Sequence, residues 1–258
     1  NFFLFLHFFL LFALLSYFLY FYHIFTVIFY KVNLIEYYHI QRTGVIIMSH
    51  KTAAFAAMAK SIITNLGKRN MEGYYFEKGA DCVKAIVDSI PQGSVVSWGG
   101  SETIKETGLL EAVKSGSYEL IDRSSAADPE EARALYAKTA LADYYVMSRN
   151  AIPLNGELIN IDGNGNRVAC LIQGPRHVIV VAGMNKIVTD VQSGVARVRN
   201  MASPANAVRL SRNLPCAAAG HCLDCLSPEC FCNQIVVTRR SGHTGRIKVY
   251  LVAEDLGY

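Results

Sequence analysis

Five of the seven cysteines in this 258-residue chain lie in one short segment. They are Cys216, Cys222, Cys225, Cys230 and Cys232, with the spacing C-x5-C-x2-C-x4-C-x-C. Pro215, Gly220 and Pro228 can bend the backbone so that several thiols face one point, as ligands of zinc or of an iron–sulfur cluster must. His221 could add a nitrogen ligand. The segment therefore predicts a metal site, and its spacing leaves the choice between zinc and an iron–sulfur cluster open.

The same cysteines have two other interpretations. They could stay reduced in a loop, or one pair could form a reversible disulfide that acts as a redox switch. A reducing compartment disfavours structural disulfides, and packing alone does not explain so many thiols in one segment. Metal binding is therefore the favoured interpretation. Cys82 and Cys170 lie far from the cluster along the chain, where we expect unreactive core residues.

Two predicted turns after strands carry residues suited to binding an anion. In the first turn, Gly99 and Gly100 would let the backbone approach a ligand closely. Ser101 and Thr103 follow them at the predicted start of a helix, where free N–H groups and the helix dipole attract negative charge. The turn therefore predicts a site for a phosphate or a carboxylate. The alternative is that the glycines only shape the turn and Ser101 only caps the helix.

The second turn follows the apolar strand predicted at residues 178–181 and contains Gly183, Asn185 and Lys186. It lies, like the first turn, at the carboxyl end of a predicted strand, where open parallel sheets bind their ligands. Lys186 could pair with the same anion. As an isolated feature, it could equally be a solvated lysine.

The elements that would position these residues alternate between helix and strand in the first half of the chain. Apolar spacing predicts helices at residues 52–66, 80–90, 102–114 and 129–141, and strands at 74–76, 94–98, 118–121 and 144–147. Asp128 would cap the last of these helices, with Pro129 at its first position. This alternation with short connections predicts an α/β fold with a mostly parallel sheet covered by helices.

The second half is expected to begin with a β-hairpin. Its strands would be residues 158–161 and 168–172, joined by the Asn-Gly-containing turn 162–166. That turn is not a calcium loop, because Arg167 stands where the loop needs glycine and Gln173 where it needs a bidentate glutamate. Further along, the pattern predicts a strand at 178–181, a long helix at 190–212 and strands at 234–238 and 246–252. The cysteine segment would lie in a loop after the long helix.

Residues 1–47 differ in composition from the rest of the chain. Residues 1–30 contain no Asp, Glu, Lys or Arg, and ten of the thirteen phenylalanines precede Met48. The dominant residue types are those of A/T-rich codons, so we expect mis-annotated upstream sequence, with the native protein starting at Met48. A membrane anchor is the alternative, because the apolar run is long enough to cross a bilayer. A signal peptide fits poorly, since the first charged residue is Lys31.

Residues 48–258 have the length and composition of one globular domain with a substantial core. Leaving out Lys31, Glu36 and Arg42 leaves 23 basic and 20 acidic residues, a net charge of +3. Because the basic residues form no large cluster, we expect no nucleic-acid partner.

Taken together, four segments of residues 48–258 resemble the LUD domain, the lactate-utilisation family. They read VSWGGSETIKETG (96–108), SRNAIPLNGELINIDGNGNR (148–167), HVIVVAGMNKIV (177–188) and GHCLDCLSPECFCN (220–233). The resemblance implies a fold similar to the NagB/RpiA/CoA-transferase group, with a ligand crevice at the two glycine turns. It also implies a link to lactate oxidation beside iron–sulfur partner proteins.

The chain departs from the family pattern after residue 152. Many members read AETGT there, whereas this chain has Leu154 at the usual glutamate position, followed by Asn155, Gly156 and Glu157. A carboxylate nucleophile of the CoA-transferase type therefore cannot be assigned to Leu154. Glu157 is displaced by three residues and is a weak catalytic candidate, while Asn155 and Gly156 remain candidates for ligand binding.

We therefore expect a cytoplasmic accessory or redox-linked protein of lactate-type organic-acid utilisation. It would bind a small anionic ligand, and a metal at the cysteine cluster, and it could work with iron–sulfur partner proteins. One alternative is a transferase or isomerase, as the wider fold group would allow. Another is a membrane-anchored redox subunit, if residues 1–47 belong to the native protein.

Overall fold

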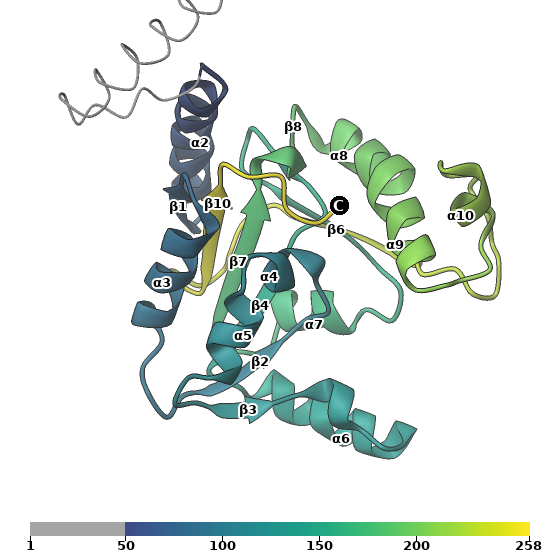
Figure 1. Cartoon of the computed structure of the whole chain (residues 1–258), viewed down its shortest axis with the longest axis horizontal. Coiled ribbons are helices and arrows are strands. Elements are labelled where there is room, and N and C mark those ends of the chain that lie inside the picture. Colours follow the sequence, from purple (N-terminus) through teal and green to yellow (C-terminus); the bar gives the residue numbers. More distant parts are fainter. Residues whose placement is uncertain (1–49) are drawn as a thin grey trace, which may run out of the picture. The chain divides into compact units, whose positions relative to one another are not determined.

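A parallel β-sheet organises the part of the chain that the computed structural model describes, residues 50–258. Six strands follow the order β1-β10-β7-β4-β2-β3, and every neighbouring pair is parallel (Figure 1). They are β1 (Glu72–Phe76), β2 (Val95–Trp98), β3 (Glu119–Ile121), β4 (Tyr144–Ser148), β7 (His177–Gly183) and β10 (Ile247–Val252). The predicted α/β class with a mostly parallel, helix-covered sheet is confirmed. The predictions for residues 1–47 lie outside the described residues.

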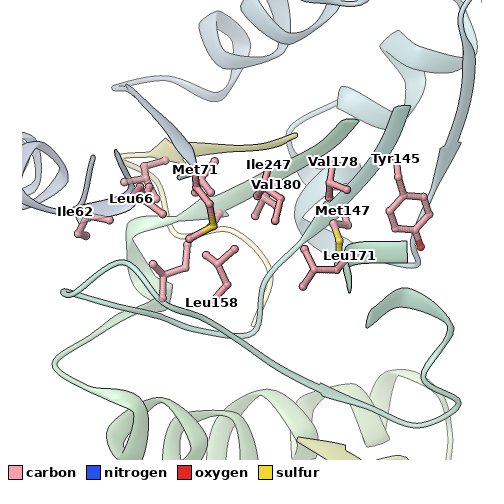
Figure 2. Close-up of a cluster of buried hydrophobic side chains, with 14 of the residues drawn as sticks. Ile62, Leu66, Met71, Tyr145, Met147, Leu158, Leu171, Val178, Val180 and Ile247 are labelled. Atoms are coloured by element: carbon pink, nitrogen blue, oxygen red, sulfur yellow. The ribbon is translucent and has the colours of Figure 1, made fainter. Parts of the chain in front are cut away.

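Helices cover both faces of this sheet because its strands are apolar on both sides. One face packs against α3 (Gly79–Ser89), α4 (Glu102–Glu106) and α5 (Leu109–Lys114). The other packs against α2 (His50–Lys68), α6 (Pro129–Ala140) and α7 (Asn166–Ile172). Along β7 the side chains alternate, with Val178 and Val180 on the second face and Ile179 and Val181 on the first. Figure 2 shows this second core, with Met71 and Leu158 packed below Val180.

The helix predicted at residues 102–114 is divided in two. Gly108 has a φ of 76°, in the left-handed region that favours glycine, and it separates α4 from α5.

The predicted cap of the helix at residues 129–141 is found as expected. Asp128 caps α6, because its side chain accepts a 2.8 Å hydrogen bond from the backbone N–H of Glu131.

The predicted hairpin at residues 158–172 is wrong in its second half. β6 (Leu158–Asp162) pairs instead with β9 (Gln234–Thr238) in an antiparallel ladder, and residues 166–172 form α7. Gly165 makes the turn with a φ of 77°, and its N–H donates to Asp162 Oδ1 at 2.8 Å. Beyond this turn Val168, Cys170 and Leu171 point into the core from one side of a helix. The Asn-Gly signal thus marked a real turn, but the turn leads into a helix.

The long helix predicted at residues 190–212 is continuous but changes its geometry midway. It consists of α8 (Val191–Arg197), the π-helical turn Val198–Ala202 and α9 (Ser203–Arg209). Pro204 has no N–H to donate and its ring crowds the preceding turn, which accounts for the wider turn before it. Figure 1 shows α8 and α9 together with α10 (Pro215–Ala219), apart from α3 on the other side of the molecule.

Short elements complete the described chain. They are the 3-10 turns Arg123–Ser125 (η1) and Met184–Lys186 (η2) and a two-stranded parallel pair of β5 (Ile152–Pro153) with β8 (Ile187–Val188). Among residues 50–258, none of the helices combines the length and apolar character needed to cross a bilayer.

Candidate functional site

A polar cavity lies where three neighbouring strands of the sheet end. β2, β4 and β7 are adjacent and parallel, so their carboxyl ends bring Gly100, Ser148 and Lys186 to the same edge. The cavity has a volume of about 140 Å³. Its polar and charged lining comprises Ser101, Glu102, Thr103, Ser148, Arg149, Asn150, Arg167, Lys186, Ser203, Asn206 and Arg209. We call it the Lys186 cavity.

Lys186 lies in η2, directly after β7, and only 3% of it is exposed. Its Nζ donates to Thr103 Oγ1 at 2.6 Å and to Ser148 Oγ at 3.2 Å. Both partners are hydroxyl groups, and Ser148 Oγ also donates to Thr103 Oγ1 at 3.2 Å. The amine is therefore held in a fixed position, and within residues 50–258 no carboxylate pairs with it directly.

This surrounding changes the proton affinity of the amine. Burial, followed by the positive charge of Arg197, lowers the pKa of Lys186 to about 7; Glu106 opposes this shift, and Arg167 adds a smaller lowering effect. A lysine in this state can exchange a proton, or act as a nucleophile, near neutral pH.

Two arginines also line the cavity but differ in their burial and in their contacts. Arg167 is fully engaged, since it donates to Asn160 Oδ1 at 2.6 Å and to Asn150 Oδ1 at 3.0 Å and its Nε lies 3.2 Å from an oxygen of Asp162. Arg149 is only 1% exposed, and within the described chain none of its three side-chain nitrogens has a hydrogen-bond partner.

Leaving a guanidinium buried without an acceptor is costly. Burial lowers the pKa of Arg149 well below its usual value, and the positive charges of Arg167 and Arg246 add to the effect, with Tyr145 opposing. Arg167 and Arg209, which line the cavity with Lys186, give its lining a positive charge. The charge of the cavity lining is therefore complementary to that of the predicted anionic ligand.

Four of the predicted ligand-binding residues line the Lys186 cavity: Gly100, Ser101, Thr103 and Lys186. An added Cβ at Gly100 would meet no atom within 4 Å, so the open space beside this glycine belongs to the cavity edge. Gly99, its neighbour, has a different role, because an added Cβ would lie 3.0 Å from the hydroxyl of Tyr145. Gly99 therefore allows close packing.

The other predicted residues of the second turn support the chain end. An added Cβ at Gly183 would collide with the backbone carbonyl of Glu254. The side chain of Asn185 accepts from the Leu256 N–H at 3.3 Å and donates to the Gly257 carbonyl at 3.4 Å. Gly183 and Asn185 thus hold residues 254–257 against the site, and Gly257 lines the cavity.

Asn155, Gly156 and Glu157 lie beside α2 and are not among the residues that line the Lys186 cavity. The carboxylate of Glu157 pairs with Arg69 at 3.3 Å, and Arg69 also donates to the Asn155 carbonyl at 2.7 Å. An added Cβ at Gly156 would lie 2.9 Å from the backbone nitrogen of Leu66. The three residues join the segment after β5 to α2.

A second cavity, of about 340 Å³, is lined by all five clustered cysteines. We call it the thiol cavity. Cys216 begins α10 and is buried, whereas Cys222, Cys225, Cys230 and Cys232 are partly exposed. The seven cysteines of the described chain are all free thiols. His221 is not among the lining residues, and its Nδ1 lies 3.0 Å from the Ala219 carbonyl.

The thiols suit a soft metal in type and in the space they face. In residues 50–258, however, no three side chains of His, Cys, Asp or Glu converge closely enough to hold a metal ion. Arg199 instead donates to Cys222 Sγ at 3.2 Å and pairs with Asp224. The predicted metal site therefore has its donors around one cavity, and ligation would require the loop to close.

The two cavities share a wall. Ile161, Ser203 and Phe231 line both of them. Ser203 Oγ accepts a 3.3 Å hydrogen bond from the thiol of Cys232. The π-helical turn 198–202 leads directly into Ser203, so the irregular part of the long helix lies between the two sites.

Several residues of the Lys186 cavity have no counterpart in the sequence-based prediction. Ser148 is the last residue of β4, and Arg149 and Asn150 follow it, so the rule that ligands bind at the carboxyl ends of strands could have identified all three. From the sequence, Arg167 indicates only that residues 162–173 are not a calcium loop. Its role depends on the fold, since its contacts with Asn150 and Asn160 join segments that a sequence pattern does not pair.

The comparisons with solved structures give weak similarities. The chain is similar to a DUF162 family protein from Deinococcus radiodurans, with 17% identity and a TM-score of 0.44 over 78% of this chain and 97% of that chain. For ribose 5-phosphate isomerase A from Neisseria gonorrhoeae, the identity is 11% and the TM-score 0.29, over 44% and 54%. For eIF2B delta from Chaetomium thermophilum, they are 17% and 0.31, over 54% of each chain. Similarities this weak carry no argument about function.

The comparison with protein families is decisive where the others are not. No curated protein matches the chain. The sequence profile of the LUD domain matches residues 59–252. This range includes every strand of the six-stranded sheet and all residues that line the two cavities except Gly257 and Tyr258. The chain therefore belongs to the LUD domain family, as the resemblance of its four motifs predicted.

Proposed function

We propose that this LUD domain binds a small organic acid of the lactate or pyruvate type in the Lys186 cavity and a metal in the thiol cavity. It would act as a redox-linked component of organic-acid utilisation, the process to which its family is linked. The observation that carries the proposal is the wall of Ile161, Ser203 and Phe231 that the two cavities share. A bound acid and a sulfur-ligated metal would be close neighbours.

The size of the Lys186 cavity favours a small acid. At about 140 Å³ it is below the range of about 300 to 1,000 Å³ that is typical of sites for larger ligands. A nucleotide or a coenzyme A molecule would have to extend far outside it. A three- or four-carbon acid would fit within the cavity.

The chemistry of the lining favours a carboxylate with an adjacent oxygen. The lining has the cationic side chains Arg149, Arg167, Lys186 and Arg209, and Glu102 is its acidic member. Glu102 already pairs with Arg209 at 3.1 Å. Thr103 and Ser148 add hydroxyls that can bond a hydroxyl or keto oxygen beside the carboxylate.

The metal would be held by four thiolates from Cys216, Cys222, Cys225, Cys230 and Cys232. An iron–sulfur cluster supplies electron transfer when bound, whereas zinc at the same place would supply structural closure. Metal analysis and an absorption spectrum of protein purified without oxygen distinguish the two. Absence of stoichiometric metal, with all five thiols free to react, would remove this half of the proposal.

Gly100→Val tests the acid site with little risk to the fold. The added side chain would meet no atom within 4 Å at its Cβ, so it should fill space at the cavity edge without disturbing neighbours. We expect weaker binding of lactate and pyruvate in calorimetry. Gly242→Val is the matched control, since Gly242 also has nothing within 4 Å and does not line the cavity. Equal affinity in Gly100→Val and wild type would contradict the proposed site.

The transferase or isomerase alternative has less support. Of its two candidate residues, Glu157 pairs with Arg69 and is not among the cavity-lining residues, whereas Lys186 lines the cavity. Turnover assays with acyl-CoA and sugar phosphates test this alternative directly. The cytoplasmic location, the membrane-anchored alternative and the iron–sulfur partner proteins stay predictions.

A further inference from the structure

Lys186 has a combination of features that anion binding alone does not require. A lysine that only balances the charge of a bound acid must be protonated, and burial without a charged partner opposes protonation. Lys186 is instead 3% exposed, bonded to two neutral hydroxyls, and placed beside other cations. These surroundings favour the neutral amine.

From this geometry we propose that Lys186 forms a reversible covalent imine with the keto carbon of a 2-oxo acid. The inference rests on the proposed function, because it requires that the acid bind in the Lys186 cavity. It adds a covalent step and narrows the substrate class to acids with a keto group next to the carboxylate.

The cavity provides the parts that this step needs. Arg167 and Arg209 line it together with Lys186, so their positive charges can attract the carboxylate. Thr103 and Ser148, which already hold the Lys186 amine, can bond the keto oxygen. A substrate held at both ends in this way would present its keto carbon to the amine.

The step balances without another reactant. The amine nitrogen of Lys186 forms a bond to the keto carbon, the carbon–oxygen bond breaks, and both amine protons end on the departing oxygen, which leaves as water. No oxidant or reductant is consumed. Hydrolysis reverses the reaction and returns the free amine and the acid.

The protonation state of Lys186 agrees with this role. Burial and the charges of Arg197 and Arg167 lower its pKa to about 7, while Glu106 opposes them. Roughly half of the amine is therefore unprotonated at pH 7, whereas an ordinary lysine is almost fully protonated. Desolvation and neighbouring cations are the two established ways to activate a lysine nucleophile.

Reductive trapping tests the proposal on the full chain. Wild-type protein is incubated with pyruvate and sodium cyanoborohydride, which converts an imine into a stable amine, and is then digested for peptide mass analysis. We expect about one adduct per chain, located on the peptide that contains Lys186. Lactate has no keto group and should give no adduct. Adduct formation should rise as pH increases through about 7.

Two variants locate the chemistry. Lys186→Arg keeps a cation but cannot form the imine, so the adduct should disappear, and a melting curve checks that the variant folds. Lys84→Arg changes an exposed lysine that pairs with Asp88 and should keep the adduct. Peptide mapping of the wild type gives the location even if Lys186→Arg fails to fold.

Calorimetry with pyruvate separates failure of the imine from failure of the acid site. Pyruvate that binds without a trapped adduct, or with an adduct elsewhere, would overturn the imine and leave the acid site standing. No binding of pyruvate or lactate would overturn both. An adduct on Lys186 that Lys186→Arg abolishes would support both.

Discussion

The Lys186 cavity and the thiol cavity share a wall, yet their functional groups are held in different ways. Lys186 is buried and Arg167 is partly buried, and both are fixed by hydrogen bonds, Lys186 to Thr103 and Ser148 and Arg167 to Asn150 and Asn160. The thiols lie in a loop in which Leu226 is 99% exposed. The first site is preorganised before its ligand arrives, and the second would gain its order from the metal it binds.

This difference has an energetic meaning. A preorganised site carries the cost of burying charges in the folded protein itself, so changes there should alter stability. A site ordered by its ligand carries that cost at binding, so changes there should alter thiol reactivity and metal affinity. The following predictions test the contrast, from the largest expected effect to the smallest.

Thiol alkylation should show the largest contrast. Cys82 is fully buried, and burial followed by the charge of Glu254 raises its pKa to about 12 from an ordinary 9.0. Its thiolate fraction is therefore lower by roughly 10³ than that of an unshifted thiol. In protein freed of metal with a chelator, iodoacetamide and peptide mass analysis should show that Cys222, Cys225 and Cys230 react far sooner than Cys82. Comparable alkylation rates for Cys82 and the clustered thiols would contradict the proposed difference between the buried core and the thiol cavity.

Replacement of Arg167 should cause the largest loss of stability. Arg167→Leu removes the ion pair with Asp162 and leaves Asn150 and Asn160 without their donor. Truncating one partner of a buried pair typically costs about 3 to 5 kcal/mol in the free energy of unfolding. Urea denaturation measures this change. Arg176→Leu is the control, since that side chain is 79% exposed and should change stability by less than about 0.5 kcal/mol.

The pH dependence of stability should report on Lys186. Its pKa is about 7 in the folded state and near 10.5 when unfolded, so between these values the unfolded chain binds more protons. The free energy of unfolding should therefore rise with pH in wild type relative to Lys186→Met. Two pH units, from 7 to 9, correspond to about 2 to 3 kcal/mol. A parallel pH profile of the two proteins would show that Lys186 is protonated like a surface lysine.

Ser203 links the two regions, and its replacement should have the smallest effect. Ser203→Ala removes the hydrogen bond with the thiol of Cys232, which should cost about 0.5 to 1.5 kcal/mol of stability. Burial raises the pKa of Cys232, and this hydrogen bond opposes the rise. The variant should therefore slow alkylation of Cys232. Ser61→Ala, on the exposed side of α2, is the control, and faster alkylation in Ser203→Ala would contradict the assignment.

The sequence predicted most of the sheet because its strands are short, apolar and separated by capped helices. Strand β7 lies where the run at 178–181 indicated, and Asp128 with Pro129 marked the start of α6. Gly100 and Lys186 were also identified, because both follow strands that end in glycine turns. Local composition decided all of these features.

The remaining features depend on partners that are distant in sequence. Residues 166–172 form a helix whose Cys170 and Leu171 pack under the sheet, whereas the Asn-Gly signal alone favoured a hairpin. Arg149 is unusual only in the folded structure, where its guanidinium is buried without a hydrogen-bond partner in the described chain. The metal prediction remains open for the same reason, since ligation depends on how the loop closes.

The order of strands in the sheet also has a consequence for how the chain folds during its synthesis. β10, at residues 247–252, lies between β1 and β7, and β1 pairs with no other strand of the sheet. β7, β4, β2 and β3 can assemble while translation continues, but β1 must wait for a partner that is made 176 residues later, as the pairing of Glu72 with Lys248 shows. Pairing over such a separation is slow. Until β10 is made, the edges of β1 and β7 therefore stay unpaired. We expect the nascent chain to be most prone to aggregation, and most accessible to chaperones, during this period.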